Sequence, residues 1–153
     1  MKTKTIAFAI SLVFVSVALG YQNNPQMGTW KLNEAKSKFA GKARNHTVVY
    51  EAAGDQTKVT VDGVDENGAA VHNEWTGKFD GKEYPVTGDA TSDMRSYRMI
   101  NKNTLSLTGK KGGKTTLSGR VVVSRDGKTR TVTTTSTNAQ GKKVTNVAVY
   151  DRQ

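Results

Sequence analysis

Apolar and polar residues alternate along most of the chain after residue 45, and a period of two is typical of β-strands with one buried face. In residues 57–64, for example, Val59 and Val61 fall on one face and Lys58 and Thr60 on the other. Glycine-containing turns separate the alternating segments. The predicted strands cover residues 27–32, 46–53, 57–64, 70–78, 83–87, 94–100, 104–110, 114–124, 129–138 and 143–152.

Short connections join these strands, and such connections force neighbouring strands to run antiparallel. A meander of this length removes its exposed edges most easily by closing on itself. We therefore predict an all-β fold, an up-and-down antiparallel β-barrel of about eight to ten strands. One short helix or 3₁₀ turn is expected after the first strand, because Asn33 is a suitable cap and Glu34 stands in the first turn.

Two short motifs resemble the lipocalin and fatty-acid-binding protein group. Gly28-Thr29-Trp30-Lys31-Leu32 is similar to the opening strand of that group, which carries Gly-x-Trp. Val149-Tyr150-Asp151 is similar to the closing strand of the fatty-acid carriers, Arg-x-Tyr-Glu. The resemblance implies a closed barrel whose seam joins these two strands. It also implies that Trp30 is a core plug covered by a late arginine, for which Arg120 and Arg152 are both candidates.

The sequence departs from the carriers' pattern at two places. The carriers have a two-helix lid between their first two strands, whereas only residues 33–45 are available here. The arginine that binds a carboxylate in the carriers, two residues before the tyrosine, is matched by Ala148, while the tyrosine is matched by Tyr150. The resemblance therefore supports the fold better than it supports the carriers' acid-binding site.

Residues 1–20 have the organisation of a secretory signal peptide. Lys2 and Lys4 precede an apolar run from Ile6 to Leu19, and Ala18-Leu19-Gly20 places small residues where export peptidases cut. The apolar run is shorter than the ~20 residues that cross a bilayer, which argues against a membrane anchor. We predict cleavage near Gly20, a periplasmic or secreted protein, and a single barrel domain over residues 21–153.

Composition limits the possible chemistry. The formal net charge is +10, and +8 remains for residues 21–153 once Lys2 and Lys4 are set aside. This surplus gives a weak attraction to polyanions and names no partner. The chain has no cysteine, so it has no disulfide, no thiolate metal site and no thiol nucleophile.

The inward face of the predicted barrel supplies the candidate ligand-binding residues. If Tyr97 points inward, Arg95 does too, and an enclosed arginine needs an anion because an unpaired buried charge is costly. One interpretation is that Arg95, Tyr97 and Tyr150 bind the acidic head of an amphiphile. The alternative is that Arg95 lies at a barrel mouth in water and the tyrosines fill the core. The candidate binding residues are Arg95, Tyr97, Tyr150, Asn146, Trp75 and Asn73.

No set of residues predicts catalysis, a metal site or a cofactor. His46 and His72 are the only histidines, and no third ligand stands at a recognisable spacing. The chain lacks a Gly-x-Ser-x-Gly motif and a carboxylate pair arranged for acid–base chemistry. Lys110-Lys111-Gly112-Gly113-Lys114 lacks the spacing of a phosphate-binding loop and is interpreted as a charged hairpin tip.

These observations favour an exported binding protein, not an enzyme, that holds a small hydrophobic or amphipathic ligand inside its barrel. The alternative is a periplasmic inhibitor or other interaction protein that acts through its loops while side chains fill the barrel. A nucleic-acid partner is not expected, because no aromatic platform accompanies the basic charge. An integral membrane barrel is not expected either, because charged residues stand on many strands. We expect a monomer.

Overall fold

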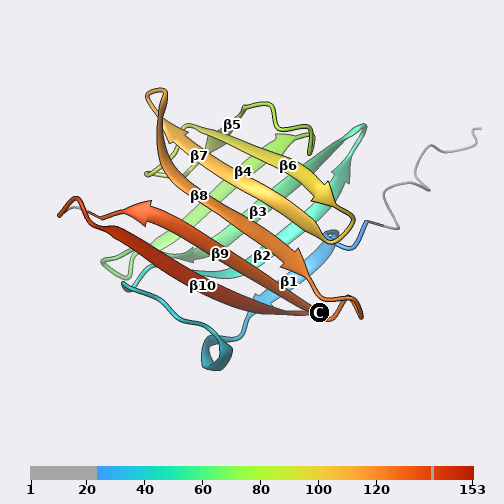
Figure 1. Ribbon diagram of the computed structural model, residues 1–153, viewed down its shortest axis with the longest axis horizontal. Coiled ribbons are helices and arrows are strands. Elements are labelled where there is room, and N and C mark those ends of the chain that lie inside the picture. Colours follow the sequence, from blue (N-terminus) through green and yellow to red (C-terminus); the bar gives the residue numbers. More distant parts are fainter. Residues whose placement is uncertain (1–23, 139) are drawn as a thin grey trace, which may run out of the picture.

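The computed structural model describes residues 24–138 and 140–153, and the strands in this part of the chain close into a barrel (Figure 1). Each strand pairs antiparallel with its neighbours in sequence, and β1 completes the ring by pairing with β10. The strands are β1 (Gly28–Leu32), β2 (Arg44–Ala53), β3 (Gln56–Val64), β4 (Ala70–Gly77), β5 (Tyr84–Thr87), β6 (Met94–Asn101), β7 (Thr104–Lys111), β8 (Lys114–Val123), β9 (Thr129–Thr137) and β10 (Lys143–Arg152). The predicted all-β, up-and-down antiparallel barrel is confirmed over the described residues.

The predicted short helix after the first strand is a 3₁₀ turn, η2 (Glu34–Lys36). Asn33 caps it, because its side-chain oxygen accepts a hydrogen bond from the Lys36 amide at 3.2 Å. The chain after η2 does not form a lid. It lies along β10, where Lys38 and Val147 exchange backbone hydrogen bonds of 2.7 and 2.8 Å. The connector therefore extends the barrel wall where β1 has ended.

The seam between β1 and β10 is built around Trp30. Trp30 lies opposite Arg152 in the strand register, its side chain is fully buried, and its indole N–H donates to the Gln26 carbonyl at 3.0 Å. The guanidinium carbon of Arg152 lies 4.2 Å from the centre of the Trp30 ring system. Of the two arginines that the sequence left open, Arg152 is therefore the one that covers the tryptophan.

The glycine of the Gly-x-Trp motif has a physical role at this seam. Gly28 has a φ of +109°, and a Cβ atom there would lie 2.9 Å from Nη1 of Arg152. A side chain at this position would strain the backbone and displace the guanidinium. Gly28 thus makes room for the arginine that covers Trp30.

An aromatic cluster fills the barrel beside β2, β4, β5 and β6. Trp75 stacks on Phe79 with ring centres 6.3 Å apart and meets Tyr97 edge-on at 4.8 Å. Tyr50 and Tyr84 complete the cluster. Aliphatic side chains continue the core around the rest of the ring: Val48, Val59, Val61, Val86, Leu105, Leu107, Val121 and Val123.

The predicted signal peptide, residues 1–20, lies outside the residues that the structure describes. Export therefore stays a prediction. Over residues 24–138 and 140–153, no helix is long and apolar enough to cross a bilayer.

Candidate ligand-binding site inside the barrel

Arg95 points into the barrel, as its strand position predicted, and its partner comes from the chain itself. Its Nη2 lies 2.7 Å from Oδ2 of Asp89, and its Nη1 donates to Oδ1 of Asn73 at 3.3 Å. The two charged side chains are 8% and 13% exposed. The connection between β5 and β6 thus supplies the carboxylate that an enclosed arginine requires, and only Nε of Arg95 is left without a hydrogen-bond partner among the described residues.

Gly88 allows the β5–β6 connection to turn inward. It has a φ of +74°, and a Cβ atom there would lie 2.1 Å from the carbonyl oxygen of His72. Asp89 then also accepts hydrogen bonds from the amide and the hydroxyl of Thr91, at 2.8 and 2.7 Å. Burial favours a higher pKa for Asp89, but the hydrogen bonds from Thr91 and the charge of Arg95 outweigh it and lower that pKa.

Replacing Asp89 by asparagine tests this ion pair. The amide oxygen still accepts a hydrogen bond, but the charge of Arg95 loses its partner, so we expect the free energy of unfolding at neutral pH to fall by about 2 kcal/mol. A carboxyl group whose pKa is lowered on folding stabilises the protein above its unfolded pKa of ~3.9, and this contribution disappears as pH falls through the folded value. Urea unfolding of both proteins at neutral and acid pH should show a difference that vanishes in acid. A difference that persists in acid would contradict the ion-pair role.

A second buried arginine, Arg130 on β9, was not singled out from the sequence. Its side chain is 3% exposed and lies opposite Tyr150 in the β9–β10 register. Nη2 donates to the Tyr50 hydroxyl at 2.5 Å. The guanidinium carbon lies 4.7 Å from the ring centre of Tyr50 and 5.5 Å from that of Tyr150. Two phenol rings thus hold the guanidinium.

No carboxylate pairs with Arg130 within the described part of the chain. Its Nε and Nη1 are buried and have no hydrogen-bond partner among these residues. Burial raises the pKa of Tyr150 to about 12 and raises that of Tyr50 further, and the charge of Arg130 only partly opposes this. Both phenols are therefore neutral at physiological pH. An arginine stays protonated in proteins, so one full positive charge remains uncompensated inside the barrel.

The other predicted site residues fall into two groups. Asn73, Trp75 and Tyr97 surround Arg95, where Trp75 donates its indole N–H to the Arg95 carbonyl at 3.0 Å. Tyr150 lies beneath Arg130. Asn146 has a structural contact in the barrel wall. Its side-chain oxygen accepts a hydrogen bond from the Ala40 amide at 2.8 Å and so fixes the β1–β2 connector against β10.

Sequence alternation could have found Arg130. Within 129–137, Arg130 shares a face with Val132, and the turn near Gly141 sets a register that brings Arg130 opposite Tyr150. The strand is rich in threonine, and Arg130 is its single charged residue. The neighbour from β2, Tyr50, is far away in sequence and follows only from closure of the barrel.

The inner wall of β8–β10 becomes more exposed with distance from Arg130. Arg130 is opposite Tyr150, both buried, and the next inward pair, Val132 and Ala148, lies closer to solvent. Further along, solvent reaches several inward-facing side chains. These half-buried positions are Leu117, Thr134, Ser136, Val144 and Asn146. The solvent exposure of the side chains along this wall thus decreases towards the buried guanidinium.

The histidines do not form a metal centre in the described structure. His72 lies on the outer face of β4, with Nδ1 2.6 Å from Oδ1 of Asp62 and Nε2 3.6 Å from Oε1 of Glu74. The hydrogen bond with Asp62 is the largest cause of its raised pKa. Among residues 24–138 and 140–153, no three histidine, aspartate or glutamate side chains are grouped to hold a metal ion.

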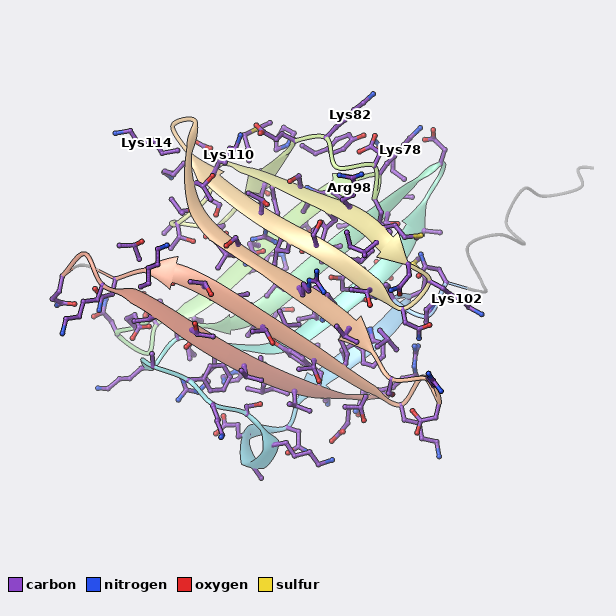
Figure 2. All side chains as sticks on the ribbon, viewed as in Figure 1. Lys78, Lys82, Arg98, Lys102, Lys110 and Lys114 are labelled. Atoms are coloured by element: carbon purple, nitrogen blue, oxygen red, sulfur yellow. The ribbon has the colours of Figure 1, made fainter. Side chains whose placement is uncertain are left out.

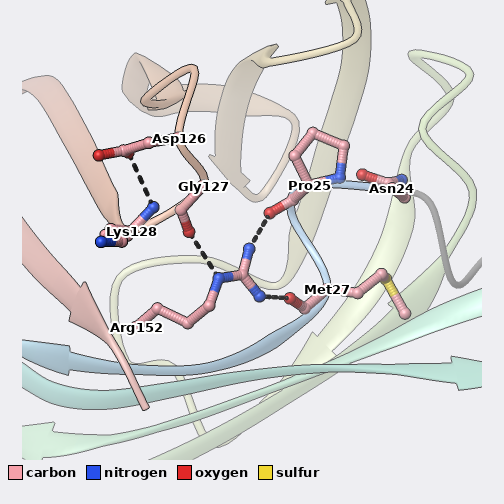
Figure 3. Close-up of a pocket in the computed structure, with 7 residues that line it drawn as sticks. All are labelled: Asn24, Pro25, Met27, Asp126, Gly127, Lys128 and Arg152. Carbon is pink, nitrogen blue, oxygen red and sulfur yellow. Dashed lines mark hydrogen bonds between the residues drawn. The ribbon is translucent and has the colours of Figure 1, made fainter.

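A surface pocket of about 410 Å³ lies beside the seam (Figure 3). The three guanidinium nitrogens of Arg152 donate to the carbonyls of Gly127, Met27 and Pro25, each at 2.6 Å. The arginine at this pocket is therefore engaged in closing the barrel, unlike Arg130. The lining residues are Asn24, Pro25, Met27, Asp126, Gly127, Lys128 and Arg152.

No protein-family model matches the sequence, and no curated protein matches it either. Among solved structures, the chain is similar to a redesigned β-barrel, mFAP1, bound to DFHBI, with 14% identity, coverage of 85% of this chain and 99% of that chain, and a TM-score of 0.45. It is also similar to a zebrafish ileal bile acid-binding protein complexed with cholic acid, with 14% identity, coverage of 84% and 99%, and a TM-score of 0.48.

Proposed function

We propose that this protein is an exported binding protein, without enzymatic activity, that holds an amphipathic molecule by an acidic head group inside its barrel. The observation that carries the proposal is Arg130, a buried guanidinium with two unpartnered nitrogens and no carboxylate beside it. Export is inferred from residues 1–20 alone, where a basic start, an apolar run and small residues follow one another.

The buried charge explains why the ligand should be acidic. Burying an unpaired ion costs several kcal/mol, and this cost is offset only when an opposite charge and further hydrogen bonds reach it. Tyr50 engages one nitrogen, whereas Nε and Nη1 are left as donors. A carboxylate supplies a full negative charge and strong acceptors, and arginine is well suited to bind it.

The wall beyond Arg130 supports an amphipathic molecule over a small inorganic anion. Val132 and Leu117 pack against the core and are only partly buried, and Thr134 and Asn146 follow on the same inward face. A ligand whose head reaches Arg130 can place its apolar part along the aliphatic side chains. The hydroxyl and amide groups nearer the solvent can contact a polar end.

Native mass spectrometry of the protein purified from its own host tests this function. We expect a co-purifying acidic molecule of lipid-like mass at one copy per barrel. After removal of that molecule, a long-chain fatty acid should rebind, and its methyl ester should bind at least about tenfold more weakly because it lacks the charge. The Arg130→Met variant should lose the co-purifying mass, and Arg125→Met, which removes an exposed arginine from the β8–β9 turn, should keep it.

Two results would overturn the proposal. One is repeated absence of any bound mass together with no binding of added fatty acid. The other is equal binding of the acid and the ester, which would remove the head-group role of Arg130.

The second candidate is an interaction protein that acts through its loops. The filled deep half of the barrel favours it, because Trp30, Tyr50 and Trp75 are at most 2% exposed. The β7–β8 tip at residues 110–114, which is exposed from residue 111 to residue 114, would then be the contact surface. An empty barrel in the host-purified protein, combined with loss of a partner on altering this tip, would support this candidate instead.

A further inference from the structure

Four successive strands, β6 to β9, contain no aspartate or glutamate. The strands on the other side of the barrel are different, since β2, β3 and β4 carry Glu51, Asp62 and Glu74. The charged side chains on the outward positions of β6–β9 are therefore all cationic. Figure 1 shows these strands side by side, forming one broad, continuous sheet. We call their outward surface the β6–β9 face.

Two arginines lie in one cross-strand row of this face. Arg98 on β6 is opposite Ser106 on β7, and Ser106 is opposite Arg120 on β8. Both arginines point outward, because the neighbouring positions Tyr97 and Val121 are buried in the core. Adjacent strands are ~4.8 Å apart, so the two arginine backbones are about 10 Å apart with a serine between them.

The cations of the β6–β9 face are largely without carboxylate partners. Within the described structure, no hydrogen bond or ion pair engages the side chains of Arg98 or Arg120. The same is true of Lys102 at the β6–β7 turn and Lys114 at the β7–β8 tip, which border the face in Figure 2. Lys110 is the exception, since it pairs with Glu83. Asp80 lies opposite Arg98 in an antiparallel bridge but forms no ion pair with it, so the face presents a net positive charge to solvent, with one carboxylate at its β6 edge.

Hydroxyl groups lie between and beside the arginines. The row continues from Arg120 to Thr133 on β9, and the next row pairs Thr108 with Ser118. Each hydroxyl both donates and accepts a hydrogen bond. The outward positions of these four strands carry no aromatic side chain, so the face offers no platform for stacking bases.

We propose that the β6–β9 face binds an extended acidic polysaccharide, one with carboxylate or sulfate groups repeated along its length. The guanidiniums of Arg98 and Arg120 pair with two of these groups. The distance of about 10 Å between the two arginine backbones is about the length of one disaccharide. Ser106 and Thr133 hydrogen-bond to sugar hydroxyls between and beyond the two charges. This surface is distinct from the interior site, so the barrel can hold a ligand while its outer wall is attached to a polymer.

The chemistry of the face favours a polysaccharide over a membrane. The exposed aliphatic residues Ile100 and Val122 are 49% and 41% exposed, but they lie at one end of the sheet beside Thr104. A surface of hydroxyls and separated cations has too little apolar area to enter a bilayer. It matches a hydrated chain that carries both charge and hydroxyl groups.

The test is the binding of full-length mature protein to polygalacturonate by isothermal titration calorimetry, with neutral dextran as the comparison. We expect binding to polygalacturonate but not to dextran, weakening with salt. The double variant Arg98→Gln/Arg120→Gln should bind at least about tenfold more weakly. The control Lys38→Gln/Lys42→Gln makes the same charge change on the exposed β1–β2 connector and should bind almost as the wild type does.

Three results would overturn the proposal. Equal weakening in both double variants would show that net charge alone drives binding. Tighter binding to phosphatidylglycerol vesicles, or to duplex DNA, lost in the arginine variant, would assign the face to a membrane or a nucleic acid. Normal affinity in Arg120→Lys would show that charge without the guanidinium geometry suffices. Unchanged thermal unfolding of each variant confirms that the fold is intact.

Discussion

Replacing Trp30 by alanine is expected to lower the free energy of unfolding by about 4 kcal/mol. The side chain is fully buried at the seam, its N–H is paired with the Gln26 carbonyl, and the Arg152 guanidinium lies over its rings. The substitution leaves a cavity, an unpaired carbonyl and an arginine without its packing surface. A small domain has only about 5–15 kcal/mol of stability, so the variant should be close to unfolding.

Guanidinium unfolding followed by circular dichroism measures this loss. Met99→Ala is the matched control, because Met99 is an apolar residue that is 44% exposed near the end of β6. We expect the control to change stability by less than about 0.5 kcal/mol. A loss below about 1 kcal/mol for Trp30→Ala would mean that the seam does not depend on the indole.

Replacing Arg130 by methionine is expected to have two opposite effects. Methionine fills a similar volume without charge, so the ligand-free barrel should gain about 2 kcal/mol of stability as an uncompensated buried ion is removed. The same change removes the partner of the acidic head group, and the affinity for a fatty acid should fall about 100-fold. Increased stability combined with lost binding is the signature of a residue kept for its ligand.

Chemical unfolding of delipidated protein and a fatty-acid titration together measure these effects. Arg125→Met makes the same substitution at an exposed position. It should change neither the free energy of unfolding nor the affinity for the fatty acid appreciably. A destabilised Arg130→Met protein would indicate that Arg130 supports the core through Tyr50 and Tyr150. Unchanged affinity would show that the ligand binds elsewhere.

The strands and their order could be predicted because the relevant signals are local. Alternation in 57–64 identifies a strand within itself, and tight turns such as the one near Gly141 force the next strand to pair back on the last. Trp30 could be assigned to the seam because, once consecutive strands are paired, β1 and β10 are the two strands left to close the ring. The choice of Arg152 over Arg120 needed the register.

The interior site could not be predicted as well, because its contacts join distant segments. Arg95 was identified, but its partner Asp89 turns inward only because Gly88 approaches the His72 backbone. Alternation places Arg130 on the inward face, although it was not among the predicted site residues, and its contact with Tyr50, which crosses 80 residues of chain, arises only when the barrel closes. The sequence correctly predicted that an enclosed arginine requires an anion, and for Arg95 this anion is Asp89. Arg130 is the buried arginine that has no carboxylate partner among the described residues.

The most direct test of the central claim is solution NMR of the mature protein with isotope-labelled arginine side chains. Arg130 is assigned by the signal that disappears in Arg130→Met. One equivalent of a fatty acid is predicted to shift the Arg130 Nε–H signal, and its methyl ester is predicted to leave that signal in place. If the Arg130 signal stays in place at saturating fatty acid, the buried guanidinium is not the acid-binding group.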